Sequence, residues 1–199
     1  LSTFLYMISA MDFLPAATTV AQRMTNGVNS FALMAIPFFI LSGQIMAQGG
    51  IAKRLINCAM ALLGSLPGGL ALVNVLSCTF FGAISGSAVA ATSAIGSFMV
   101  PQMKKAGYSP EFSAAVTASA STTGLLIPPS NILIIYAIAS GGVSISALFL
   151  AGYIPGLLVA LALMIFCVIY AKRKGFKTGE RLPINIVLKQ VWQAVPSLA

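Results

Sequence analysis

The sequence predicts an all-α integral membrane protein, and three observations lead to this class. Of the 199 residues, 58% are hydrophobic and only 7% are charged, whereas a soluble domain carries about 25% charged residues. The mean hydropathy is +0.97. The 11 basic residues lie mainly in short clusters between apolar runs, as membrane topology places them. The net charge of +8 therefore indicates membrane orientation and not a nucleic-acid-binding face.

The first elements in the chain are expected to be membrane and interfacial helices. Residues 1–20 are interpreted as the end of a membrane helix that turns at the interface around Asp12 and Pro15, and residues 23–30 as a polar link. Residues 31–47 form an apolar run long enough for a short span. Residues 51–63 begin with two basic side chains and continue as an apolar run, which predicts an amphipathic helix lying at the interface.

Residues 70–103 contain two apolar arms joined by residues 81–87. Each arm is about as long as a short membrane span of ~17 residues, so two full spans and a re-entrant hairpin both fit the length. A loop that reaches water usually carries charge or several turn-forming residues. This join is small, uncharged and flanked by apolar residues. We therefore favour a re-entrant hairpin whose tip lies inside the membrane.

The next segment predicts a discontinuous helix. Residues 111–126 would extend ~24 Å and residues 131–140 a further ~15 Å, so neither half crosses a bilayer alone. Pro128 and Pro129 separate the halves, because proline has no N–H to donate to a helix. Unpaired backbone is tolerated at membrane depth only inside protein or along a cavity. Breaks of this kind are where transporters bind substrates and ions.

The last part of the chain predicts one full span and a second interfacial helix. An uncharged link at 141–148 precedes the span at 149–170, and residues 182–198 form the interfacial helix. If the hairpin returns to its own side, nearly all basic clusters share one side of the membrane. The positive-inside rule makes that side cytoplasmic.

The residues that could carry chemistry are neutral. The chain has no His, its three acidic residues lie at the edges of predicted spans, and its three cysteines are scattered. We therefore expect no transition-metal site and no enzyme activity. Backbone carbonyls and hydroxyls at helix breaks suit sodium, and helix starts suit an anion. The candidate sodium- and substrate-binding residues are Ser85, Gly86, Ser87, Ser121, Thr122, Thr123, Gly124, Pro128, Ser130 and Asn131.

Several motifs with almost continuous spacing carry a family resemblance. They include Asn-Gly-Val-Asn-Ser-Phe at 26–31, Gly-Ala-Ile-Ser-Gly-Ser at 82–87, Val-Pro-Gln-Met-Lys-Lys at 100–105, Leu-Ile-Pro-Pro-Ser at 126–130 and Phe-Leu-Ala-Gly-Tyr-Ile-Pro-Gly at 149–156. Together they resemble the amino-terminal half of the large membrane subunit of TRAP (tripartite ATP-independent periplasmic) transporters. Asn131 departs from the apolar residue expected after Pro-Pro-Ser, and it could contact substrate or ion or cap the following half-helix.

The resemblance implies an elevator-type, sodium-coupled carrier of carboxylates such as C4-dicarboxylates or sialic acid. It implies a multi-pass protein of the bacterial inner membrane, with a small membrane subunit and a periplasmic substrate-binding protein as partners, and with no cofactor except Na⁺ as coupling ion. Residues 1–66 would form scaffold helices and an interfacial arm. Residues 67–140 would form the hairpin and broken helix of a transport domain, and residues 141–199 a scaffold helix and a cytoplasmic arm. The inverted second repeat would lie outside this sequence, which we interpret as part of a longer chain.

Two other interpretations remain open at the level of sequence. One is a stand-alone, ion-coupled anion symporter of similar architecture that works without a binding protein. The other is a membrane scaffold or channel subunit that transports nothing. In that subunit the small residues and helix breaks would serve close packing alone.

Overall fold

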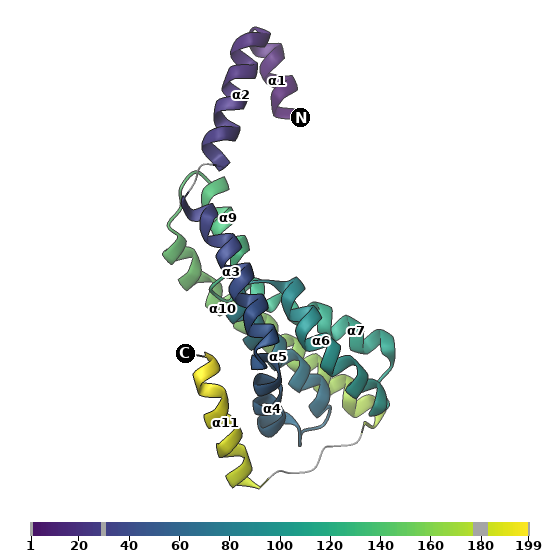
Figure 1. Ribbon diagram of the computed structural model, residues 1–199. Coiled ribbons are helices and arrows are strands. Elements are labelled where there is room, and N and C mark those ends of the chain that lie inside the picture. The colour runs from purple at the N-terminus through teal and green to yellow at the C-terminus, as the bar shows by residue number, and fades with distance from the viewer. Residues whose placement is uncertain (1, 29–30, 177–182, 199) are drawn as a thin grey trace.

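The computed structural model describes residues 2–28, 31–176 and 183–198, and every regular element in these ranges is a helix. The predicted all-α class is therefore confirmed for the described residues. Helices α1 (Ser2–Ala10) and α2 (Phe13–Val28) contact each other and stand away from the other helices, which gives the molecule an elongated shape (Figure 1). Most of the remaining helices pack around α5, whereas α9 packs against α3 and α10, and α11 packs against α4.

The start of the chain departs from the prediction in one respect. The helix breaks at Met11 and Asp12, close to the predicted turn. However, α2 continues to Val28, so the predicted polar link is wrong for residues 23–28, and residues 29–30 lie outside the described ranges. The Thr25 hydroxyl donates to the Ala21 carbonyl at 2.8 Å within this helix. Polar side chains do not end a helix, because most of them cost it well under 1 kcal/mol per residue.

Helices α3 (Phe31–Gln48), α4 (Ile51–Leu63) and α11 (Ile184–Leu198) follow the predicted bounds closely. One side of α4 is buried through Leu55 and Ala59, whereas Lys53 and Arg54 are exposed. Helix α11 packs along α4, so the two predicted interfacial arms contact each other (Figure 1). Their position at a membrane interface stays a prediction.

The two predicted arms are helices α5 (Gly69–Ser85) and α6 (Ala88–Lys105), which pack against each other and are joined by Gly86 and Ser87. Helices α7 (Pro110–Ser121), α8 (Thr123–Leu126) and α9 (Asn131–Ala139) follow. The segment Pro110–Leu126 is bent by 53° from Asn131–Ala139 at the predicted break. The re-entry of the hairpin into a membrane and the crossing by the broken helix stay predictions.

Helix α10 (Ile145–Lys174) is longer than the predicted span at 149–170. Ser144 caps its first turn by accepting a hydrogen bond from the Ala147 N–H at 3.4 Å, which shortens the predicted link. Among the described helices, α10 is the one long and apolar enough to cross a membrane alone, and the bent pair of α7–α8 with α9 could form a second span. Only 22% of the most apolar stretch of α10 is buried, so most of the apolar side chains of α10 face outward.

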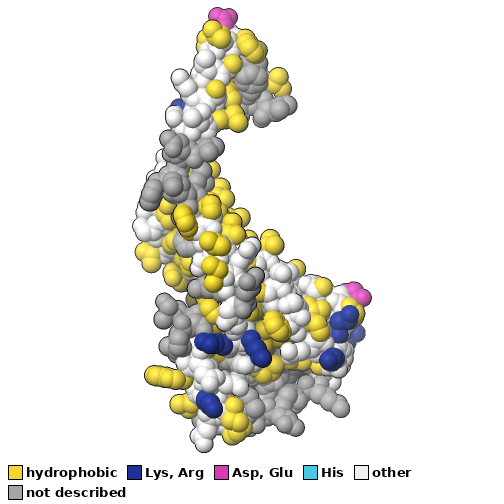
Figure 2. Space-filling model, in the orientation of Figure 1, with side chains coloured by type: hydrophobic (Ala, Val, Ile, Leu, Met, Phe, Trp, Pro, Cys, Tyr) yellow, Lys and Arg dark blue, Asp and Glu magenta, His cyan; other side chains and the backbone are white. Residues whose placement is uncertain are grey.

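The surface separates charge from apolar area. In Figure 2, Lys and Arg side chains gather on the lower part of the visible face, over the bundle, and hydrophobic side chains are widely exposed above them. Exposed apolar side chains on α10 include Leu150, Ile154, Leu158 and Leu161. Because soluble monomers rarely expose large contiguous apolar areas, this surface favours contact with lipid or with other membrane helices.

Candidate functional site

The hairpin tip is built by three consecutive residues. Ser85 ends α5, and Gly86 adopts a left-handed conformation with φ of 62°, which a residue with a side chain rarely tolerates. Ser87 is extended and caps α6 by accepting a hydrogen bond from the Ala90 N–H at 3.3 Å. The Ser85 hydroxyl lies 3.4 Å from both the backbone N–H and the carbonyl of Ser87. These long contacts hold the Ser85 oxygen only weakly.

The break between α8 and α9 is equally compact. Ile127 is extended, Pro128 and Pro129 follow, and Ser130 caps α9. The Ser130 hydroxyl accepts from the Leu133 N–H at 3.3 Å and donates to the Leu125 carbonyl across the break. One hydroxyl thus bonds to the backbone of both half-helices, so the sequence LIPPS forms a fixed corner and not a loose loop.

Glycine residues bring the tip and the break together. A Cβ placed on Gly82 would lie 2.5 Å from the Gly124 Cα, so α5 and α8 meet backbone to backbone. A Cβ placed on Gly86 would lie 2.7 Å from the Pro129 carbonyl oxygen and 3.6 Å from the Asn131 nitrogen. No side chain fits at these contacts. The structure therefore places the hairpin tip beside the break, and the role of their residues as ligands stays a prediction.

Asn131 differs from its neighbours in hydrogen bonding. Its side chain is only 9% exposed, and its Oδ1 atom has no hydrogen-bond partner among the described residues. A buried acceptor without a partner costs about 1–3 kcal/mol. We call Ser85–Ser87 together with 128–131 the tip–break junction. It contains no charged residue, and it holds a buried acceptor without a hydrogen-bond partner among the described residues.

The other predicted site residues have their hydroxyls engaged elsewhere. Ser121 is buried and donates to the Thr117 carbonyl at 2.8 Å. Thr123 is buried, donates to the Ala120 carbonyl at 2.6 Å and lies 2.9 Å from the Thr79 hydroxyl. Thr122 is exposed and bonds to its own helix at Ser119. Gly124 serves the backbone contact with α5. Ser121, Thr123 and Gly124 therefore lie in a packing interface with α5.

That interface contains residues that the sequence analysis did not select. The Asn74 amide of α5 donates to the Thr117 hydroxyl at 2.7 Å, and the Cys78 thiol lies 3.5 Å from the Asn74 Oδ1 atom. Both Asn74 and Thr117 are buried. We call this interface the polar seam; its members are Asn74, Cys78, Thr79, Thr117, Ser121 and Thr123. A lone Asn inside an apolar arm was the available signal.

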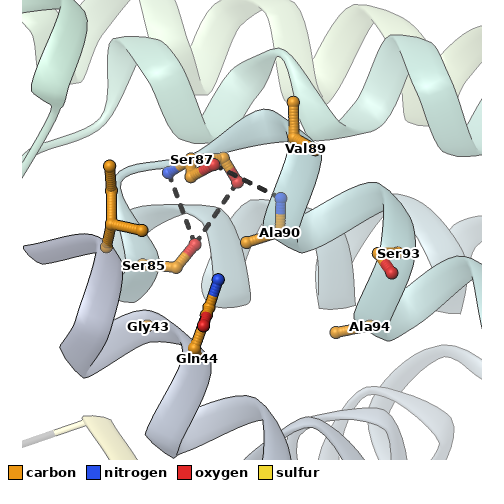
Figure 3. Close-up of a pocket in the computed structure, with 9 residues that line it drawn as sticks. Gly43, Gln44, Ser85, Ser87, Val89, Ala90, Ser93 and Ala94 are labelled. Carbon is orange, nitrogen blue, oxygen red and sulfur yellow. Dashed lines mark hydrogen bonds between the residues drawn. The ribbon is translucent and has the colours of Figure 1, made fainter.

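A cavity of about 400 Å³ opens between α3 and the hairpin tip. Its polar lining comes from Gln44 of α3 with Ser85, Ser87 and Ser93, and the first turn of α6 forms one wall. In Figure 3 the Gln44 side chain extends towards the tip. The helices approach closely at Gly43, where an added Cβ would lie 3.0 Å from the Ser85 Cβ. Sequence reasoning missed Gln44 and Ser93, because a contact between α3 and the tip has no local signature.

The chemistry available here is neutral and suited to charge of either sign. Hydroxyl, amide and carbonyl oxygens can coordinate a hard cation at the tip–break junction. The first turn of α6 leaves N–H groups without intrahelical partners and carries the positive end of the helix dipole. That end faces the cavity through Val89 and Ala90, so an anionic group would be favoured there.

Comparisons with known proteins bear on the whole chain. The family model described as Tripartite ATP-independent periplasmic transporter, DctM component, matches residues 1–199. Protein YgiK of Salmonella typhimurium is 50% identical over 198 residues, which cover 100% of this chain and 46% of that protein. The ectoine TRAP transporter large permease protein TeaC of Halomonas elongata is 48% identical over 163 residues, covering 82% and 38%.

A third relative, the C4-dicarboxylate TRAP transporter large permease protein DctM of Vibrio cholerae, is 43% identical over 176 residues. The match covers 88% of this chain and 38% of that protein. The chain therefore spans less than half the length of each of these three relatives.

Proposed function

We propose that this chain, which belongs to the family of the DctM component of tripartite ATP-independent periplasmic transporters, supplies part of a sodium-coupled permease for carboxylates. The chain covers less than half of its relatives, so the proposal concerns the full-length protein. The family supports a bacterial inner-membrane location, a small membrane subunit and a periplasmic binding protein as partners. No catalytic step is proposed.

The observation that carries the sodium proposal is the unpaired Asn131 Oδ1 atom in the tip–break junction. The weakly held Ser85 oxygen and the carbonyl oxygens beside Pro128 and Pro129 are further neutral oxygen ligands in the same junction. Sodium bound there would satisfy the orphaned acceptor and repay part of its burial cost. We assign coordination to the Ser85 hydroxyl and the Asn131 side chain together with backbone carbonyls of Gly86, Ser87, Pro128 and Ser130. The Ser87 and Ser130 hydroxyls cap α6 and α9, so they position the junction instead.

We assign a different role to the predicted ligands of α7 and α8. The hydroxyls of Ser121 and Thr123 anchor the break to α5 through the polar seam, so they hold the junction in place. Thr122 and Gly124 border the junction, and their carbonyls complete the candidate set for sodium. Hydroxyl groups with strong internal partners are the weakest candidates, because coordination would break those bonds.

The cavity between α3 and the tip supports an anionic substrate. Gln44, Ser87 and Ser93 offer neutral donors, and the dipole of α6 favours negative charge at the same wall. Two relatives are named for ectoine and for C4-dicarboxylates, so the substrate varies within the family. We propose a carboxylate of the C4-dicarboxylate or sialic-acid type.

An elevator movement fits the way α3 meets the hairpin. The proposed fixed scaffold contains α3, and the proposed moving part contains α5 to α9. Their contact at Gly43 and Ser85 is close and uncharged, so the surfaces can slide without breaking an ion pair. The substrate cavity lies between the two parts, as alternating access requires.

The experiment is uptake of labelled C4-dicarboxylate, sialic acid and ectoine by proteoliposomes holding the full-length permease with its small subunit and binding protein. Uptake that needs both an inward sodium gradient and the binding protein would support the proposal. Uptake with sodium but without the binding protein would indicate a stand-alone symporter. No uptake under any condition, from correctly folded protein, would favour the scaffold hypothesis.

A matched pair of variants tests the site within that assay. Asn131→Leu removes the orphaned acceptor and keeps the branching of the side chain, and we expect the sodium concentration for half-maximal uptake to rise about tenfold, the change that corresponds to a loss of about 1.4 kcal/mol. Asn57→Leu changes an exposed Asn on α4 and should leave the sodium dependence unchanged. An Asn131→Leu protein with the sodium dependence of the unmodified protein would remove Asn131 from the site.

A further inference from the structure

A second cavity, of about 650 Å³, lies at the end of the hairpin opposite the tip. It is formed where the last residues of α4, α6 and α10 meet the first residues of α5. The candidate transport site does not include it. Its lining combines two kinds of side chain, apolar ones in the body and a basic one at the edge.

The body of this cavity is apolar and partly aromatic. Met60, Leu70 and Phe176 line it together with Tyr108. The rings of Tyr108 and Phe176 stack with centroids 4.0 Å apart. Burial, with a smaller contribution from Cys167, raises the pKa of Tyr108, so its hydroxyl stays neutral at physiological pH. A wall of this kind favours hydrocarbon and excludes a strongly hydrated ion such as free phosphate.

The edge of the cavity is basic. Lys105 lines it, and Lys104 precedes it in the last turn of α6. The last turn of α10 carries three more basic residues at 172–174, directly before Gly175, which also lines the cavity. None of these five side chains forms an ion pair with a described residue. Glu111, the acidic residue nearest to Lys104 and Lys105 along the chain, is exposed in the first turn of α7.

We propose that this cavity binds an anionic phospholipid, with the phosphate at Lys105 and one acyl chain against Met60, Leu70 and Phe176. Basic pockets between membrane helices on the cytoplasmic side are suited to acidic headgroups. The adjoining apolar wall selects a lipid over a small soluble anion. The inference rests on the membrane location of the family and not on sodium coupling or on the substrate. The bound lipid would join the base of the hairpin to the end of α10.

The test is native mass spectrometry of the full-length protein in a neutral detergent, titrated with phosphatidylglycerol or phosphatidylcholine of the same acyl chains. We expect preferential retention of phosphatidylglycerol. Lys105→Gln should weaken that retention about fivefold, the loss expected for one basic group at an anionic headgroup. Lys105→Arg should keep it, because the charge is retained. Lys53→Gln, an exposed change on α4 away from the cavity, should have no effect.

Three outcomes would overturn the proposal. The first is equal retention of the two lipids, and the second is an equal loss in Lys105→Gln and Lys53→Gln. The third is displacement of phosphatidylglycerol by millimolar inorganic phosphate, which would make the site a soluble-anion pocket. The readout is lipid binding, so a failure here leaves the transport proposal standing, and failed transport leaves this result interpretable.

Discussion

The polar seam and the tip–break junction both contain small neutral polar side chains, yet they differ in how their polar atoms are used. In the seam, Asn74 and Thr117 bond to each other and both are buried. In the junction, Asn131 is 9% exposed and its Oδ1 atom has no described partner. The density of Ser, Thr and Asn in an apolar chain is therefore not a sufficient mark of a ligand site. The distinguishing property is the unsatisfied acceptor.

The two regions also differ in their proposed tasks. The seam fixes α5 against α7 and α8, and its hydrogen bonds are short. The junction has the 3.4 Å contacts of Ser85 and the orphan of Asn131. A site that exchanges an ion needs oxygens that can be released at little cost, whereas a packing interface needs oxygens that stay bonded. Four substitutions test this difference.

The largest expected effect comes from separating α5 from α8 at the contact of Gly82 with Gly124. Gly124→Ala would place a Cβ 2.3 Å from the Gly82 Cα, and backbone cannot yield as a flexible side chain does. We expect a loss of about 3 kcal/mol in the free energy of unfolding, at the upper end for overpacking. Thermal denaturation of the full-length protein in detergent measures it. Ala115→Ser, at an exposed position of α7, should change it little. Equal melting temperatures for the two variants would contradict the close crossing.

The second effect concerns stabilisation by the ion. At sodium concentrations 100 times the dissociation constant, binding should stabilise the folded protein by about 2.7 kcal/mol. Asn131→Leu should lose most of this stabilisation while its stability in potassium is unchanged or raised, because an orphaned buried acceptor has been removed. Melting temperatures in sodium and in potassium check both parts. A sodium-dependent shift as large as that of the unmodified protein would contradict the assignment.

The third substitution should have the opposite pattern of effects from the second. Asn74→Leu removes a bonded amide from the polar seam and leaves Thr117 without its donor. We expect a loss of about 1–3 kcal/mol in stability in either salt, with an unchanged difference between sodium and potassium. Chemical denaturation in the two salts gives both values. If Asn74→Leu instead removed the sodium effect, the seam and the junction would be one site.

The smallest effect on stability is expected at the hairpin tip. Ser85→Ala removes only two contacts of 3.4 Å, so the cost should be at most about 0.5 kcal/mol. The same change removes a proposed ligand, and we expect sodium affinity to fall severalfold. Isothermal titration with sodium measures the affinity. A variant that is strongly destabilised but binds sodium normally would place Ser85 in a structural role.

The sequence predicts local features of this fold better than distant contacts. Residues that interrupt helices act within a few positions, so Gly86 at the tip and Pro128–Pro129 at the break lie where they were expected. The extension of α2 to Val28 was missed, because polar composition was interpreted as a link.

The sequence was a poorer guide to which polar groups pair between helices. Ser121 and Thr123 were selected with the break because they are adjacent in sequence, but their hydroxyls are bonded on the side that faces α5. The role of Gln44 depends on a crossing of α3 with the tip that no local pattern specifies. Helix faces can be estimated from periodicity, whereas the partner of each face depends on the assembled bundle.

The glycine crossing of α5 and α8 has a mechanical consequence. Where side chains interdigitate, one helix can shift against another by changing rotamers, but at Gly82 and Gly124 there is no side chain to rearrange. A displacement of the hairpin along α3 would therefore move the break by the same amount. The tip and the break would keep their spacing throughout this movement. An ion bound between them would move with them as one rigid body and would keep its coordination throughout.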